Sequence, residues 1–350
     1  MSTLWVSMMV VMGCGGGSGD GGGDADADTD VDADTDVDAD TDADTDTDTG
    51  TDSASDSDSE TGTDTGAEIT LDEIADAVSQ TDYETCVQEM ADFGTRYATA
   101  ANHDEVVDWL GAKFEALGYA PIEDRFPVDA DEGVNVYAIL EGSANPDTLW
   151  LYSAHYDSTS GSRMTDAPGA DDNASGVCAV FEAARVLASY SLEDSIAFVA
   201  TDAEELGSIG SAHLVTWLPD DFDVAGAVAP DMIGYWPLQD ADLFDILGDP
   251  DSEFMVDAMA TIADDLGVAR KTWIDHDYCY GDDHTNYQEA GIPAITPMDC
   301  VEAHNLGGES TPHYHETSDL PDTLYYPFTM KVVGVITASL ADWAGIAGRR

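Results

Sequence analysis

The sequence contains the stretch Ala167-Pro168-Gly169-Ala170-Asp171-Asp172-Asn173-Ala174-Ser175-Gly176-Val177, around which the rest of the chain is organised. Two adjacent carboxylates stand there between a Pro-Gly turn and the small residues that begin a helical pattern. Ser153-Ala154-His155-Tyr156-Asp157-Ser158 lies upstream, and Thr201-Asp202-Ala203-Glu204-Glu205-Leu206-Gly207 lies downstream. Together these segments gather His and acidic side chains, which are the ligands of divalent metal ions.

Helical and strand patterns alternate along the second, globular part of the chain. Helical periodicity covers residues 69–93, 106–117, 176–190, 211–218, 254–266 and 324–343, and strand patterns cover 134–140, 148–153, 195–200, 224–229 and 292–296. This alternation, with apolar strands of the buried kind, predicts an α/β fold. In such sheets, ligands bind beyond the carboxyl ends of the strands. Four of the acidic and His side chains follow directly on predicted strands: His155, Glu204, Glu205 and Asp231.

The charge of the chain excludes several classes of partner. Ten Lys and Arg residues stand against 73 Asp and Glu residues, which gives a net charge of −63 over 350 residues. Nucleic acids and anionic lipid surfaces both require clustered basic residues, so neither is an expected partner. No apolar run approaches the roughly 18 to 20 residues of a membrane-spanning helix.

Six segments of the chain, in this order, resemble metallopeptidase family 28, the secreted bacterial double-zinc aminopeptidases. The segments are 153–158, 168–176, 202–207, Asp231-Met232-Ile233-Gly234, Asp283-His284 ahead of Ala290-Gly291-Ile292-Pro293, and Tyr314-His315-Glu316-Thr317-Ser318-Asp319. The resemblance implies a three-layer α/β/α sandwich around a central mixed, mostly parallel sheet.

The resemblance also implies a metal ligand at each of five positions. His155 and Asp231 would bind one ion, and Glu205 and His315 the other, with Asp172 bridging the two. Nitrogen and oxygen ligands without a cysteine cluster fit two Zn²⁺ ions, with Mn²⁺ or Co²⁺ as alternatives. Taken singly, each of these five residues has a simpler explanation, as a polar residue at a strand end, as an acidic residue at the start of a helix or as an N-cap. Their order along the chain favours the metal site.

Catalytic roles follow from the same resemblance. Glu204 would be the general base for a metal-activated water, and Asp157 would hydrogen-bond the other ring nitrogen of His155. Tyr314 would supply a phenol to the oxyanion, with Tyr280 as the alternative. The family places a cis peptide after its bridging acid, here between Asp172 and Asn173, and His284 matches a position that supports the site.

The expected activity is that of a zinc metallopeptidase, most simply an aminopeptidase acting on peptides as a monomer. Carboxypeptidases need a cation for the terminal carboxylate, and only Arg163, in the long loop 159–167, lies within the motif loops. An aminopeptidase instead holds an ammonium group with carboxylates, which this chain has in excess. The alternatives are a carboxypeptidase, a glutaminyl cyclase of the same fold, or a non-catalytic surface binding protein.

The N-terminal part predicts export. Residues 1–14 form a short apolar stretch ending in Cys14, which resembles a lipoprotein signal peptide with its lipidation cysteine, although the first basic residue is Arg96. The alternative is a disordered N-terminus with a chance cysteine. Residues 15–66 are Gly-, Asp- and Thr-rich and predict a disordered tether, since the Asp repeats lack the Gly and Glu of a calcium loop. Residues 67–350 would form the peptidase domain.

These features together predict a lipoprotein at the cell surface or in the periplasm, or a form released from it, whose only membrane contact is a lipid anchor. Cys279 and Cys300 flank the Asp283 to Pro293 region, and an exported chain could pair them or leave them free. Cys178 lies in an apolar helical pattern and is expected to be a buried thiol. Cys86 has no expected role.

Overall fold

The computed structural model describes residues 68–236, 243–274, 282–299 and 311–350. Contacts divide the chain into two units, Met1–Asp64 and Thr65–Arg350, and all of the described residues lie in the second. The signal segment and the tether predicted for residues 1–66 lie outside the described residues, so both remain predictions. Among the helices that are described, none has the length and apolar composition needed to cross a membrane.

An eight-stranded mixed sheet forms the centre of this unit. Its strands and those of a second, small sheet are β1 (Ile122–Val128), β2 (Asp131–Leu140), β3 (Asn145–His155), β4 (Tyr190–Leu192), β5 (Asp194–Thr201), β6 (Asp223–Val228), β7 (Phe244–Gly248), β8 (Arg270–Ile274), β9 (Ala294–Met298) and β10 (Ile346–Arg349). The large sheet has the order β1-β2-β5-β3-β6-β9-β7-β8, and β10 pairs with β4. The pairs β3–β5, β3–β6, β6–β9 and β7–β8 are parallel, and the others in this sheet are antiparallel.

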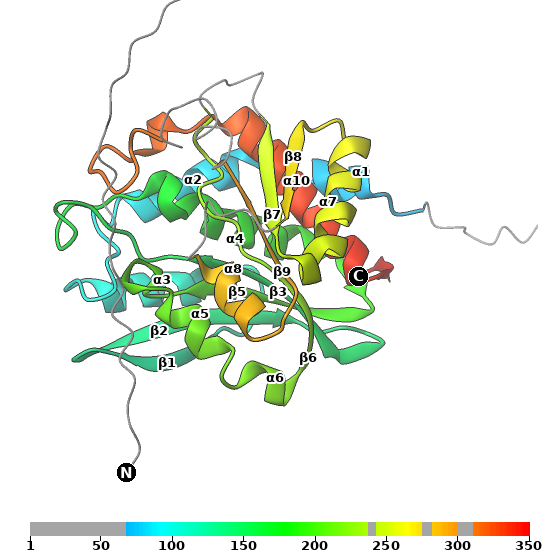
Figure 1. Ribbon diagram of the computed structural model, residues 1–350, viewed down its shortest axis with the longest axis horizontal. Helices are drawn as coiled ribbons and strands as arrows, with labels where there is room; N and C mark the ends of the chain where they lie inside the picture. The colour runs from blue at the N-terminus through cyan, green and yellow to red at the C-terminus, as the bar shows by residue number, and fades with distance from the viewer. Residues whose placement is uncertain (1–67, 237–242, 275–281, 300–310) are drawn as a thin grey trace, which may run out of the picture. The chain divides into compact units, whose positions relative to one another are not determined.

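Helices cover both faces of the large sheet (Figure 1). One layer contains α1 (Leu71–Asp76), α2 (Gln80–Ala91), α3 (His103–Ala116), α4 (Gly176–Leu187), α7 (Glu253–Asp265) and α10 (Tyr326–Trp343), and the other contains α5 (Ile209–Leu214), α6 (Leu218–Asp221) and α8 (Asp283–Glu289). Side chains along β3 alternate between the layers, because successive residues of a strand point to opposite faces. Trp150, Tyr152 and Ala154 join the larger core, whereas Leu149 and Leu151 join the smaller one. This confirms the predicted three-layer sandwich with a mixed, mostly parallel sheet.

Helix α4 fixes the position of the Asp171-Asp172 stretch that precedes it. All twelve of its residues are buried except Arg185. The alanines of this helix, among them Ala179 and Ala183, have no bulk to hold its backbone away from β3 and β5, which it contacts directly. The turn before α4 is therefore held at the edge of the sheet where β3 ends.

A disulfide joins Cys86 of α2 to Cys178 of α4, with their Cα atoms 5.8 Å apart. The expectation that Cys178 is a free buried thiol is wrong. Helical periodicity identifies the buried face of α4, but it does not reveal that α2 packs across that face and places Cys86 opposite. Cys14, Cys279 and Cys300 lie outside the described residues, so lipidation at the first and pairing of the other two remain predictions.

Replacing Cys86 and Cys178 together by alanine should lower the free energy of unfolding by about 2–5 kcal/mol. The cysteines are 92 residues apart, so the cross-link removes many conformations from the unfolded chain. Urea unfolding followed by circular dichroism, at a fixed zinc concentration, measures the change. Wild-type protein treated with a reductant is the control and should unfold at the variant's lower midpoint. Equal midpoints for the oxidised wild type and the variant would contradict this role of the disulfide.

Candidate metal centre

The fold brings the five predicted ligands to one edge of the sheet. His155 is the last residue of β3, and Glu205 and Asp231 come shortly after β5 and β6, the parallel neighbours of β3. Asp172 lies in the irregular turn that leads into α4, and His315 lies in the segment that precedes α10. The convergence follows from the topology, since adjacent parallel strands present their carboxyl ends on the same side.

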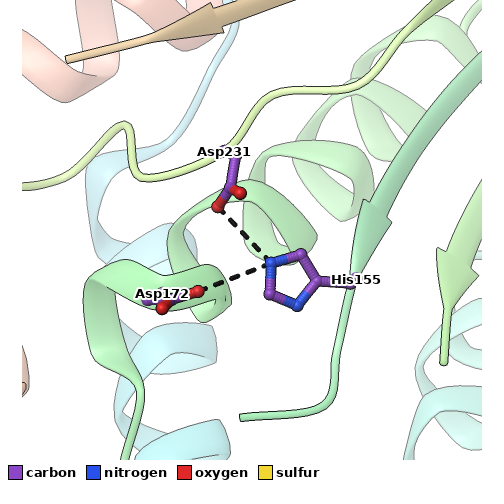
Figure 2. A group of neighbouring side chains, drawn as sticks. All are labelled: His155, Asp172 and Asp231. Atoms are coloured by element: carbon purple, nitrogen blue, oxygen red, sulfur yellow. Dashed lines mark ion pairs between the residues drawn. The ribbon is translucent and has the colours of Figure 1, made fainter. Parts of the chain in front are cut away.

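The five side chains form two groups that share Asp172. In the first group, the Nε2 atom of His155 lies 3.4 Å from Oδ1 of Asp172 and 3.4 Å from Oδ1 of Asp231. Figure 2 shows these two carboxylates pointing at the same ring nitrogen. In the second group, Nε2 of His315 lies 3.3 Å from Oδ2 of Asp172 and 3.1 Å from Oε2 of Glu205. Each oxygen of Asp172 thus faces a different group, which is the arrangement of a bridging ligand.

These spacings fit zinc. Ligands at about 2.0–2.1 Å from a tetrahedral ion lie about 3.3 Å from one another, which matches the separations in both groups. Three buried atoms at the centre have no hydrogen-bond partner among the described residues: Nε2 of His155, Oε1 of Glu205 and Oδ1 of Asp231. Buried polar atoms are rarely left without a partner. Two of these atoms belong to the first group and one to the second, so each group contains at least one buried ligand atom that a divalent cation would satisfy, while the ligand roles themselves remain predictions.

The electrostatics of the groups reflect closely packed charges. Burial raises the pKa of the Glu205 carboxyl to about 7, and the charge of Asp172 adds to the rise. Burial would lower the pKa of His315, but hydrogen bonds with Asp172 and Glu205 outweigh it and hold that pKa at about 10. His155 behaves similarly, because Asp231 and Asp157 raise its pKa against the effect of burial. Without a metal ion, protons take up part of the negative charge that a cation would otherwise neutralise.

Backbone hydrogen bonds hold Asp172 in place. Both oxygens of the Asp319 carboxylate accept, Oδ1 from the Asp171 N–H at 2.9 Å and Oδ2 from the Asp172 N–H at 3.0 Å. Oδ1 of Asp171 in turn accepts from the N–H groups of Gly234 and Tyr235, just beyond Asp231. The peptide bond between Asp172 and Asn173 is cis, as the resemblance implies. No role was predicted for Asp171 or Asp319, although both lie inside segments that carry the family resemblance.

The position of Asp157 differs in part from its expected one. The Nδ1 atom of His155 lies 3.1 Å from the backbone carbonyl of Asp157 and 3.6 Å from its carboxylate. The carboxylate instead accepts from the backbone N–H groups of Glu204 at 3.0 Å and Glu205 at 3.2 Å. Asp157 therefore orients His155 mainly through its carbonyl oxygen, while its side chain fixes the loop that carries the two glutamates.

Glu204 lies beside the metal groups and belongs to neither of them. Its Oε1 atom accepts a hydrogen bond from the Ser208 hydroxyl at 2.9 Å. Burial raises the pKa of Glu204 well above its usual value, and Asp283 and Asp231 add to the rise, although His155 opposes it. A carboxylate whose proton affinity is raised by its surroundings is suited to accept a proton near neutral pH.

A hydrogen-bond network around Asp202, which was not predicted, holds the start of the loop that carries Glu204 and Glu205. Nε2 of His103 lies 2.7 Å from Oδ2 of Asp202 and 3.0 Å from the Tyr156 hydroxyl. Asp202 also accepts from the N–H groups of Val134 and Ala203. Burial lowers the pKa of His103, but the hydrogen bond with Asp202 and its charge outweigh this and raise the pKa overall. In the sequence, the one indication of this network was Asp202, an acidic residue two positions before Glu204.

Tyr314 and His284 are the remaining site residues of the prediction that the structure describes. Tyr314 is 50% exposed, and its ring stacks on that of His315 with the ring centres 3.7 Å apart. His284 is buried outside both metal groups, and burial lowers its pKa to about 4, so it is neutral. Two histidines for which no role was predicted, His213 and His313, contact Asp124 and Ser318. Tyr280, His276 and His304 lie outside the described residues.

Comparisons with known proteins point to one family. Residues 135–339 match the family described as Peptidase family M28. A "Probable zinc metalloprotease" of Pyrenophora teres f. teres (strain 0-1) is 32% identical over an alignment of 189 residues, and the match covers 47% of this chain and 41% of that protein. This match spans less than half of that relative's length. A protein of the same description from Pyrenophora tritici-repentis (strain Pt-1C-BFP) is 26% identical, over 78% of this chain and 76% of its own.

Solved structures share the fold. An aminopeptidase from Aneurinibacillus sp. strain AM-1 has a TM-score of 0.67 at 15% identity, covering 80% of this chain and 97% of that one. The glutaminyl cyclase of Porphyromonas gingivalis has a TM-score of 0.62 at 22% identity, covering 76% of this chain and 99% of that one. At these identities the likeness concerns the fold.

Proposed function

The chain belongs to peptidase family M28, and we propose that it is an aminopeptidase that uses two zinc ions to release amino-terminal residues from peptides. The observation that carries this proposal is the arrangement of Asp172, whose two oxygens face two separate His–carboxylate groups. The zinc metalloproteases to which the chain is similar support both the metal and peptide hydrolysis, and the fold that the chain shares with an aminopeptidase is compatible with the proposed reaction.

Each ion would have three ligands from the chain. His155, Asp231 and Asp172 would hold one, and His315, Glu205 and Asp172 the other. When bound, the ions supply Lewis acidity that polarises the peptide carbonyl and makes water nucleophilic near neutral pH. The ligands themselves provide fixed positions at the strand ends, so the geometry exists before substrate arrives.

Glu204 would move the proton. The Ser208 hydroxyl holds its Oε1 atom and thereby orients the carboxylate. In the proposed reaction Glu204 takes a proton from the attacking water and passes it to the amine of the leaving peptide. Tyr314, which is half-exposed beside His315, would donate its phenol to the oxyanion that forms on the carbonyl.

The charges near the site favour the amino end of a peptide. Arg96 and Arg163 are the basic residues in the loops 93–97 and 156–175 that border it. Arg96 is 1% exposed and donates to backbone carbonyls, and the guanidinium of Arg163 lies over the Tyr97 ring at 5.2 Å. Arg96 is therefore not free to receive a carboxylate, which leaves Arg163 as the one basic residue of these loops that could, whereas acidic side chains that can hold an ammonium group are in large excess.

A pair of substrates tests the proposal. Leucyl anilide with a free amine should be hydrolysed with a kcat/KM about 100-fold higher than its N-acetylated form, because blocking removes charge-assisted hydrogen bonds. Anilide release in zinc-containing buffer measures both rates, with Glu204→Gln as the inactive control. Equal rates for the two substrates would refute an aminopeptidase.

Other products identify the alternatives. Removal of the last residue from an N-acetylated peptide would indicate a carboxypeptidase, and ammonia release from a glutaminyl peptide would indicate a glutaminyl cyclase. Zinc binding without turnover of any of these substrates would indicate a binding protein.

We also propose that the protein acts on peptides as a monomer outside the cytoplasm, held to the membrane through a lipid on Cys14. The Cys86–Cys178 disulfide supports export, since structural disulfides form and persist in oxidising compartments. The acidic composition supports a free-standing, soluble domain at the end of a charged tether.

A further inference from the structure

Arg96 places a positive charge in the interior, between the loops that carry His155 and Asp172. It is 1% exposed and is among the largest fully buried side chains of the described residues. A buried charge is costly unless its donors find partners, so an arginine at such a position needs a specific set of acceptors.

All four hydrogen bonds of the guanidinium go to backbone carbonyls. Nε donates to the carbonyl of Tyr156 at 2.7 Å, directly after the ligand His155. Nη1 donates to Pro168 at 2.5 Å and to Met90 at 3.1 Å, and Nη2 donates to Gly169 at 2.8 Å. The planar group thus ties the loop after His155 to the loop before Asp172 and takes no carboxylate oxygen from the metal groups.

The two loops are also joined beside Arg96. The Ser158 hydroxyl accepts from the Arg96 N–H at 3.2 Å and donates to the Ala167 carbonyl at 2.7 Å. Gly169 has a φ of +51°, and a Cβ there would lie 2.9 Å from Nη2 of Arg96 and 2.6 Å from Cβ of Ser158. The loop before Asp172 is therefore packed directly against the arginine.

The charge itself acts differently from the hydrogen bonds. Burial lowers the pKa of Arg96 to about 10, which the carboxylates of Asp319 and Asp157 oppose, so the group is charged at neutral pH. A nearby positive charge disfavours cations by Coulomb repulsion. Charge alone would make Arg96 weaken metal binding, whereas its hydrogen bonds would strengthen it by fixing the ligands.

We propose that Arg96 is a positioning residue for the metal centre, which sets the separation of His155 and Asp172 by clamping the loops that carry them. This inference rests on the proposed zinc site. Residues that orient metal ligands typically change metal affinity about 10–100-fold when they are replaced.

Arg96→Lys separates the two effects, because it keeps the charge and loses the planar fork. Zinc dissociation constants are measured by titrating zinc chloride in competition with a colorimetric chelator, on protein whose circular dichroism shows it folded. We expect Arg96→Lys and Arg96→Gln to bind zinc about 10–100-fold more weakly than wild type. Arg270→Gln, which removes a guanidinium paired with Asp264 at the surface, is the control and should not change the affinity.

Ser158→Ala provides a second, milder variant, since it removes a neutral link between the same two loops. It should weaken zinc binding in the same direction by a smaller factor, and it serves if the arginine variants do not fold. An unchanged affinity in Arg96→Lys, a tighter one in Arg96→Gln, or an unchanged one in Ser158→Ala would overturn the positioning role alone. Wild-type protein that binds no zinc would overturn the proposed function and this inference together.

Discussion

Replacing Asp172 by asparagine is expected to remove both zinc ions from the protein. Asp172 is the residue whose Oδ1 faces the His155 group and whose Oδ2 faces the His315 group. An asparagine of the same size cannot offer a charged oxygen to both ions. The local fold should survive, because the N–H of residue 172 still donates to the Asp319 carboxylate.

The loss should be visible in stability as well as in metal content. A ligand present at 100 times its dissociation constant stabilises a protein by about 2.7 kcal/mol per site. Two sites would therefore raise the melting temperature of wild-type protein by roughly 10 °C or more, and Asp172→Asn should show no such gain. Metal analysis after dialysis and calorimetry with and without zinc provide the two measurements.

Variants of residues that belong to only one metal group are matched controls for the bridging role of Asp172. Asp231→Asn and His315→Ala each remove a ligand that belongs to one group only, so each should lose one ion and keep the other. If Asp172→Asn retained one ion, or if wild-type protein held only one, Asp172 would belong to a single site and the bridging role would be wrong.

The sequence predicted the part of this centre that local patterns encode. His155, Glu205 and Asp231 follow buried strands, and parallel strands end on one edge, so their proximity follows from periodicity and topology. Asp172 and His315 lie in irregular segments, and only the order of the matched segments indicated them. The structure brings all five together, while the ions themselves remain a proposal.

Contacts between distant segments were beyond the reach of local patterns. No spacing along the chain links Arg96 to the carbonyls of Pro168 and Gly169, or Cys86 to Cys178. Similarly, sequence proximity placed Asp157 near His155, but it could not tell whether the carbonyl or the carboxylate faces the ring.

The two edge strands of the large sheet, β1 and β8, were not predicted from the sequence, because an exposed strand has a weak apolar pattern. β1 reads Ile-Glu-Asp-Arg-Phe-Pro-Val, and as an edge strand it exposes most of its first half, so it shows little apolar alternation. β8 lies at the other edge and is only partly buried. The helical pattern predicted to reach Tyr190 ends at Leu187, because Tyr190 pairs with Arg349 in the small sheet.

Glu204→Gln is expected to lower kcat by about 10²–10⁴-fold while both zinc ions stay bound. The amide has the shape of the carboxylate and can still accept from the Ser208 hydroxyl, but it cannot take a proton from water. The backbone N–H of residue 204 keeps its bond to Asp157, so the loop should hold its place. Hydrolysis of leucyl anilide gives kcat and KM, and metal analysis of the same samples gives the zinc content.

The neighbouring residue, Glu205, provides a comparison that distinguishes a general base from a metal ligand. Glu205→Gln is the same chemical change one position along, yet Glu205 belongs to the His315 group and Glu204 belongs to neither. Glu205→Gln should therefore lose one ion and its share of the zinc-dependent stabilisation, whereas Glu204→Gln should lose neither. Loss of zinc from Glu204→Gln would make Glu204 a ligand, and activity within tenfold of wild type would place the general base elsewhere. Only a base that stands apart from the ligands gives a fully metal-loaded, stable and inactive protein.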